Sequence, residues 1–231
     1  RSDVVLDSHS GRFATMAIDT DGLAWLVQQD AVEWVEPRPF YEILNSKGIQ
    51  VMNVDDTWSS TNMASIDTSW SGLDGSGIIV TVADTGLDNG VNNSNMHPDF
   101  RDHITGILSF PPSASTCASL SLSPCGDDAE DHHGHGTHVA GSVLGDGTHS
   151  NGDIMGAAPE AHLLVHSIAT THNSEEKLLG IPNDLDDLFK LAWANNSRIH
   201  TNSWGSAVSG QYTTSSMQAD ASARTHDELV I

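Results

Sequence analysis

One short apolar run constrains the fold of this chain more than any other segment. Residues 78–83 read Ile-Ile-Val-Thr-Val-Ala, follow a glycine directly and are rich in β-branched side chains. A run this short, apolar on both alternating faces, predicts a strand buried on both sides. Strands of that kind occur in parallel sheets covered by helices, so the run favours an α/β fold.

The rest of the chain alternates strand and helix candidates in the same manner. Residues 161–168 and 198–202 predict strands, and residues 182–196 predict a helix between them. A weaker helix is expected at 214–225, leading into a strand that stops midway at 228–231. The apolar positions of the stronger helix fall at i, i+3, i+4 and i+7: Leu185, Leu188, Phe189 and Ala192. Strands alternating with helices imply crossover units and a parallel sheet.

The first 75 residues have a different character. Residues 21–29 predict a short helix, and residues 31–37 alternate well enough to predict a strand that ends at a proline. Residues 38–75 are irregular, with an exposed connection at 59–62. The first residue is Arg1, with no targeting segment after it, so we expect the amino end to be cut.

The charge balance excludes some classes of partner. The formal net charge is −22, from 31 acidic and 9 basic residues, and such a field repels nucleic acid and anionic membranes. No stretch approaches the ~18 apolar residues of a membrane helix. The acidity has two functional interpretations: adaptation to salty or extracellular conditions, or acidic loops that bind calcium. The alternative is an acidic surface that only keeps the protein soluble.

The two cysteines, Cys117 and Cys125, lie eight residues apart in a stretch rich in Ser and Pro. They form neither a zinc pattern nor a Cys-x-x-Cys redox pair. A small loop-closing disulfide in an exported protein is the preferred interpretation, and two free thiols are the alternative.

Asp84 follows the run at 78–83 directly and precedes Thr-Gly-Leu-Asp. Reactive groups of open parallel sheets gather at the carboxyl ends of strands. An aspartate in this place can be held by turn amides and directed at a partner. Taken alone, it is more simply explained as a turn or capping residue.

A glycine- and alanine-rich segment at 134–145 predicts a helix that approaches its neighbours closely, with His135 at its first turn. A histidine beside a strand-end carboxylate can act as a general base toward a hydroxyl nucleophile. The alternatives are exposed polar residues or a metal cluster, formed with His132, His133 and His138.

Together, the segments 82–88 and 135–141 resemble the subtilisin-like serine proteases, the subtilases. They resemble the family's segments around its catalytic aspartate and catalytic histidine, and they stand in the family's order, 51 residues apart. The resemblance implies a triad in which Asp84 orients His135, with His138 structural. We then expect the Asp84 carboxylate within about 2.6–3.2 Å of His135 Nδ1. No cofactor is required for this chemistry.

A third match, Asn-Ser-Trp-Gly at 202–205, resembles the subtilase stretch that pairs its backbone with an extended substrate. By this resemblance Ser203, Trp204 and Gly205 would lie along a polypeptide substrate. The fuller string at 198–205 is similar to that of alkaline subtilases with an extra carboxyl-terminal β-domain.

The front of the chain resembles the end of a subtilase propeptide. The implied organisation is a propeptide-like α+β remnant at 1–44, followed by the amino-terminal part of a catalytic domain with a subtilisin-like, incomplete parallel sheet at 45–231. Processing is expected near Leu44 or Asn45. An ordinary amino-terminal extension is the alternative.

The chain departs from the subtilase pattern in one respect. The family's Gly-Thr-Ser-Met-Ala-like segment and its oxyanion asparagine are missing, and residues 215–217, Ser-Ser-Met, lack the preceding glycine and come too early. We therefore expect an extracellular serine endopeptidase whose sequence stops before its serine, inactive as given, with its own propeptide as a partner. Structural calcium would bind the acidic loops at 88–99 and 127–131, although no ligand set can be named. A non-catalytic peptide-binding relative and a histidine-rich metal-binding module are the alternatives.

Overall fold

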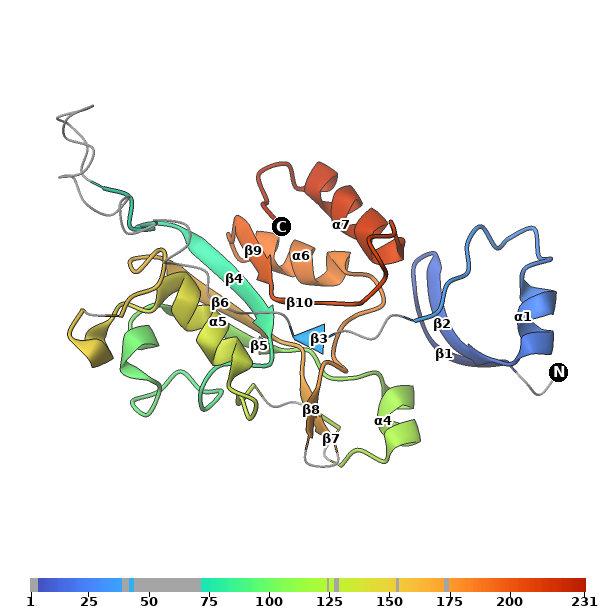
Figure 1. Cartoon of the computed structure of the whole chain (residues 1–231), viewed down its shortest axis with the longest axis horizontal. Coiled ribbons are helices and arrows are strands. Elements are labelled where there is room, and N and C mark those ends of the chain that lie inside the picture. Colours follow the sequence, from blue (N-terminus) through green and yellow to red (C-terminus); the bar gives the residue numbers. More distant parts are fainter. Residues whose placement is uncertain are drawn as a thin grey trace.

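The computed structural model describes residues 4–38, 42–43, 72–123, 125–126, 129–152, 154–172 and 175–231. At its centre lies a parallel sheet, which in these residues has the strand order β5-β6-β4-β9. Helices lie on both sides of it (Figure 1). The predicted class, an α/β fold with a parallel sheet flanked by helices, is confirmed. The strands of this sheet are β4 (Ile79–Asp84), β5 (Ile104–Ser109), β6 (His162–Ser167) and β9 (Ile199–Asn202).

Strand β4 is interior and buried on both faces, as its sequence predicts. On one face Val80 and Val82 belong to the same apolar cluster as Val139 of helix α5 (His135–Leu144). On the other face, Thr81 lies in register with His200 of β9 and Ala83 with His166 of β6. The sheet therefore has an α5 side and an opposite side.

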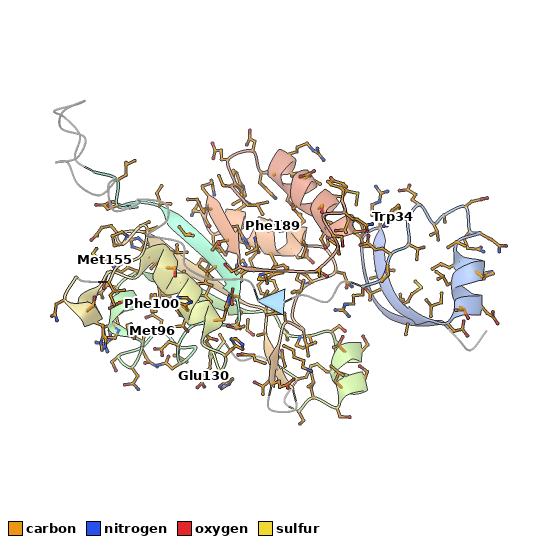
Figure 2. All side chains as sticks on the ribbon, in the orientation of Figure 1. Trp34, Met96, Phe100, Glu130, Met155 and Phe189 are labelled. Carbon is orange, nitrogen blue, oxygen red and sulfur yellow. A yellow bond between two sulfur atoms is a disulfide. The ribbon has the colours of Figure 1, made fainter. Side chains whose placement is uncertain are left out.

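The opposite side is covered by helices α6 (Asp186–Ala194) and α7 (Thr214–Thr225), which pack against each other. The apolar face expected of the first helix is confirmed: Leu185, Leu188, Phe189 and Ala192 are all buried. Figure 2 labels Phe189 on this side and Met96 and Phe100 near α5. Helix α6 is shorter than the predicted 182–196: it begins at Asp186 and ends at Ala194.

Several smaller elements connect these layers, and the sequence did not predict β5, α4 or the β7–β8 hairpin. They are η2 (Pro98–Phe100), α4 (Ala114–Leu120), η3 (Thr148–Ser150), β7 (Thr170–His172), β8 (Glu175–Lys177) and β10 (Trp204–Gly205). Cys117 of α4 is bonded to Cys125, with their Cα atoms 5.6 Å apart. The predicted disulfide is confirmed.

The amino-terminal unit lies at one end of the molecule (Figure 1). Strands β1 (Val4–Ser10) and β2 (Phe13–Ile18) form an antiparallel hairpin that the sequence did not predict, followed by α1 (Thr20–Leu26), shorter than the expected 21–29. The strand predicted at 31–37 is wrong: these residues form no strand and pair with no strand among the described residues. Trp34 is 68% exposed, and the Glu36 carboxylate instead accepts a hydrogen bond from Thr214 N.

At the other end, the strand expected at 228–231 is only a single parallel bridge between Val230 and Ile199. The His200 amide donates to Val230 O at 2.8 Å, and the Val230 amide donates to Arg198 O at 2.9 Å. Most of the irregular region 38–75 lies outside the described residues. None of the helices in the described ranges combines the length and apolar character that crossing a membrane needs.

Candidate active site

Asp84 is the last residue of β4 and is almost fully buried, at 1% exposure. Its Oδ1 accepts a hydrogen bond from the Thr85 amide at 2.7 Å and another from His135 Nδ1, also at 2.7 Å. The distance expected from the sequence is therefore confirmed. Burial raises the pKa of Asp84, and the hydrogen bonds from His135 and Thr85 oppose that rise.

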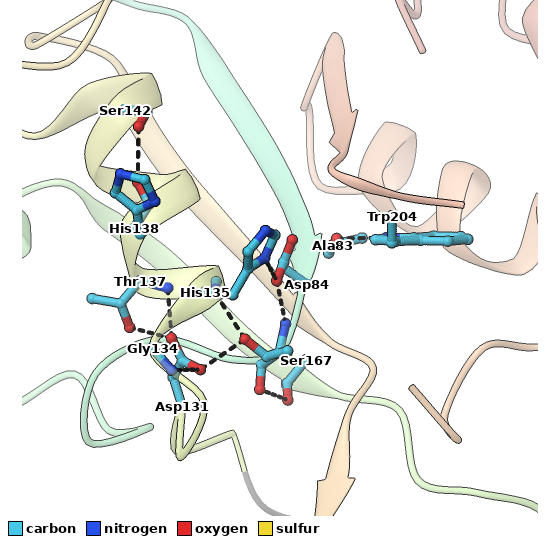
Figure 3. Close-up of polar contacts among 12 residues, drawn as sticks. Ala83, Asp84, Asp131, Gly134, His135, Thr137, His138, Ser142, Ser167 and Trp204 are labelled. Atoms are coloured by element: carbon cyan, nitrogen blue, oxygen red, sulfur yellow. Dashed lines mark hydrogen bonds and ion pairs between the residues drawn. The ribbon is translucent and has the colours of Figure 1, made fainter. Parts of the chain in front are cut away.

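His135 is the first residue of α5, and the residue before it, Gly134, adopts the left-handed conformation with φ 84°. The turn through Gly134 directs the imidazole toward the end of β4 (Figure 3). Because a carboxylate only accepts, the bond to Asp84 places the proton on Nδ1 and leaves the Nε2 lone pair free. Among the described residues Nε2 is buried and has no hydrogen-bond partner.

Glycines allow the close approach of α5 to the turn after β4. A Cβ added at Gly136 would lie 2.4 Å from Gly86 O, well inside van der Waals contact. Gly86 itself has φ 135°, and a Cβ there would lie 2.5 Å from Ala129 O. Glycine at 136 therefore allows α5 to lie against the turn after β4, and glycine at 86 allows that turn to lie against residues 129 and 130.

The segment predicted to bind substrate, residues 203–205, lies beside the Asp84–His135 pair. Trp204 and Gly205 form β10, and Trp204 Nε1 donates to Ala83 O at 2.8 Å, directly before Asp84 (Figure 3). Strand β10 already carries an extended backbone, because it pairs antiparallel with β3 (Glu42–Ile43) of the amino-terminal segment. Ser203 lies between β9 and β10, half-buried.

The histidines around His135 do not converge on a common point. His138 is exposed on α5, and His132 faces Glu130 with Nδ1 3.7 Å from Oε1. Within the described ranges no three His, Cys, Asp or Glu side chains are arranged to hold a metal ion. The metal-cluster alternative gains no support here.

Two carboxylates in the acidic loops expected to bind calcium accept hydrogen bonds from the chain's own backbone. Asp88 Oδ2 accepts the His97 amide at 2.6 Å, and Asp131 accepts amides of the α5 turn. Asp127 and Asp128 lie outside the described residues, so calcium stays a prediction.

Residues 215–217 lie in the first turn of helix α7, which carries a capping box between Thr213 and Ser216. These residues are therefore helical. They do not form the turn of a nucleophilic serine, which agrees with the sequence analysis. Sequence reasoning missed the residues that support the Asp84–His135 pair: Thr85, Asp131 and Thr137. The available signal was an acidic residue shortly before an uncapped, glycine-led helix start.

Comparison with known proteins gives one consistent result. The model of the subtilase family matches residues 75–231. The major intracellular serine protease of Bacillus subtilis (strain 168) is 31% identical over 138 residues, which is 59% of this chain and 38% of that protease. A subtilisin of Bacillus sp. (strain TA39) is 37% identical over 94 residues, covering 41% of this chain and 19% of that protein.

Among solved structures, the epidermin leader peptide processing serine protease (EpiP) of Staphylococcus aureus has a similar fold. Its TM-score is 0.55 at 14% identity, covering 97% of this chain and 52% of that one. The chain thus spans about two fifths or less of the length of the two curated relatives described here.

Proposed function

This chain belongs to the subtilase family, and from that premise we propose that it is part of a serine endopeptidase in which Asp84 and His135 are two members of the catalytic triad. The single observation that carries the proposal is the buried bond from His135 Nδ1 to Asp84, with Nε2 left free of partners among the described residues. A general base needs this arrangement, in which one ring nitrogen is fixed and the other can accept a proton.

The proposed reaction is peptide-bond hydrolysis by acyl transfer. A serine outside the present sequence attacks the scissile carbonyl carbon while His135 Nε2 takes the serine proton. His135 then gives that proton to the leaving amine as the peptide C–N bond breaks. Water, deprotonated by the same nitrogen, hydrolyses the acyl-enzyme and restores the serine. Asp84 fixes the imidazole tautomer and stabilises the imidazolium throughout.

The test is hydrolysis of polypeptide substrates by the full-length protein that contains this chain, beside two histidine variants of α5. His135→Ala should lower kcat by about 10⁶, the magnitude known for subtilisin. His138→Ala is the matched control, since this side chain is exposed on the same helix, and it should keep the activity. Equal activity in wild type and His135→Ala would contradict the proposal.

We also propose that residues 1–44 are a propeptide and residues 45–231 the beginning of the catalytic domain. Three contacts between the two parts support this. Strand β3 pairs with β10, Thr15 Oγ1 donates to Asn183 Oδ1 at 2.9 Å, and Glu36 meets the amino end of α7 at Thr214 N. The carboxylate at a helix amino terminus adds a favourable charge–dipole term. An open pocket of about 830 Å³ lies between the two parts.

The register of β3 on β10 supports a particular processing bond. Glu42 lies opposite Gly205 and Ile43 opposite Trp204, so the two residues directly before Leu44 in the sequence are held along β10. We propose Leu44–Asn45 as the bond that is cut. Mass spectrometry of the processed full-length protein should then find Asn45 at the new amino terminus, and Leu44→Pro or His135→Ala should abolish it. Cleavage more than two residues away, or cleavage persisting in His135→Ala, would contradict this assignment.

The β3–β10 pairing also favours the second candidate, a peptide-binding protein without catalysis. Such a protein would bind peptides through Ser203, Trp204 and Gly205 and would not depend on His135. The His135→Ala experiment separates the two functions. An extracellular location is our further proposal, supported by the Cys117–Cys125 disulfide, because disulfides persist in oxidising compartments. Detection of the protein only in the reducing cytosol would contradict it.

A further inference from the structure

Asp131 has the most fully satisfied carboxylate close to the Asp84–His135 pair. Its Oδ1 accepts from Thr85 Oγ1 at 2.7 Å and from the Gly134 amide at 2.8 Å. Its Oδ2 accepts from the Thr137 amide at 2.7 Å and from Thr137 Oγ1 at 2.6 Å. A carboxylate offers about four acceptor positions, and these bonds use them fully.

The partners of Asp131 flank both members of the pair, and Figure 3 labels Gly134 and Thr137 close to His135. Thr85 follows Asp84 directly, while Gly134 and Thr137 lie on either side of His135. The Thr85 hydroxyl donates to Asp131 and accepts from the Gly136 amide at 2.8 Å, which ties the turn after β4 to the first turn of α5. One carboxylate thus joins the two segments that carry Asp84 and His135.

The local sequence explains why this carboxylate is needed. The residue that begins α5 is preceded by Gly134, which has no side chain to accept the free amides of the first turn. Asp131 supplies that acceptor from outside the helix, and its charge at the amino terminus strengthens each bond. Its own amide donates to Asp88 O at 2.9 Å, so the carboxylate is itself fixed in place.

We infer that Asp131 is a positioning residue that sets the distance and orientation between His135 and Asp84. It bonds to neither side chain of the pair and to no reacting atom, and it acts through Thr85, Gly134 and Thr137. The catalytic consequence rests on the proposed function. The effect of Asp131 on the bond from His135 Nδ1 to Asp84 does not rest on that function, because the bond is present in the chain as given.

The direct test is the NMR signal of the His135 Nδ1 proton in the ¹⁵N-labelled chain. Asp131→Asn keeps the shape but replaces one acceptor oxygen with an NH₂ group that cannot accept, so the two hydrogen bonds to that oxygen are lost. The signal should then exchange faster with solvent and shift away from its hydrogen-bonded position. Asp99→Asn is the matched control, since the Asp99 carboxylate accepts the His149 amide at 2.6 Å on another part of the molecule, and it should leave the signal unchanged.

The kinetic arm uses the full-length protein. Displacement of His135 by Asp131→Asn should lower kcat by about 10²-fold with KM within about twofold, because a misplacement near 1 Å carries that cost. Thr85→Val removes the linking hydroxyl and should change the signal and kcat in the same direction, which keeps the inference testable if Asp131→Asn does not fold. If Asp131→Asn lowered Tm but left the His135 signal and kcat unchanged, the positioning role of Asp131 would be overturned. Absence of hydrolysis in wild type would instead refute the proposed function, and the NMR result would still decide the role of Asp131.

Discussion

Two buried histidines on the side of the sheet opposite α5 should make this fold sensitive to acid. His166 of β6 and His200 of β9 are 0% and 2% exposed, and their ring centroids lie 5.6 Å apart. Phe110 packs on the first ring and Phe189 on the second. Among the described residues, the four ring nitrogens have no hydrogen-bond partner. A proton on either ring would be buried without compensation.

Burial lowers the pKa of His166 to about 4, and burial together with the neighbouring His166 lowers the pKa of His200 to about 3. An unfolded histidine has a pKa near ~6.5. Because the folded value lies below the unfolded one, each histidine contributes stability above pH ~6.5 that is lost as the pH falls toward the folded pKa. Between pH 7 and pH 5 the linkage amounts to a loss of about 2 kcal/mol for each histidine.

The assay is urea unfolding at pH 7 and pH 5, with the free energy taken from the midpoint and slope. His166→Leu should remove about half of the pH-dependent loss, and the double variant with His200→Leu nearly all of it. Leucine has a similar volume and no titrating group. His138→Gln, at an exposed position, should leave the loss unchanged. If the double variant loses as much stability on acidification as wild type, the two histidines are not responsible.

Three further outcomes follow from the same structure. Reduction of Cys117–Cys125 should lower the free energy of unfolding by about 2.5 kcal/mol, from the closure of an eight-residue separation, whereas complete thiol labelling without reductant would show that the bond is absent. Gly136→Ala should cost about 1–3 kcal/mol because its Cβ would clash with Gly86 O, and an unchanged Tm would refute that contact. The 231-residue chain as given should lack peptidase activity beyond background, because no described hydroxyl meets His135 Nε2. Activity that His135→Ala abolishes would reveal a nucleophile within it.

The sequence predicted the parts of the fold that depend on local patterns. The run at 78–83 predicts β4 because burial on both faces requires apolar residues at successive positions. The helical spacing from Leu185 to Ala192 predicts the buried face of α6. Asp84 and His135 could be found because one follows a strand directly and the other begins a helix.

The elements that were missed depend on tertiary contacts. Helix α4, at 114–120, is short, four of its seven residues are the weak helix formers Ser, Thr and Cys, and Ser113 caps it. The β1–β2 hairpin was not predicted from the sequence. The one local signal was Gly11, which adopts a positive φ of 53° at the turn. Residues 31–37 carry a strand-like alternation, but a strand also needs a neighbour, which no sequence pattern supplies. The role of Asp131 depends on Thr85, 46 residues away along the chain.

The measurement that tests the account most directly is the turnover of Asp84→Asn in the full-length protein. Asparagine keeps the shape of Asp84 but lacks the negative charge that favours the proton on His135 Nδ1 and stabilises the imidazolium. We expect kcat to fall by about 10⁴-fold while KM stays nearly constant, because the lost interaction acts in the transition state. A decrease of less than about tenfold, with the fold intact, would contradict the assignment of Asp84 and His135 as the acid–base machinery of this chain.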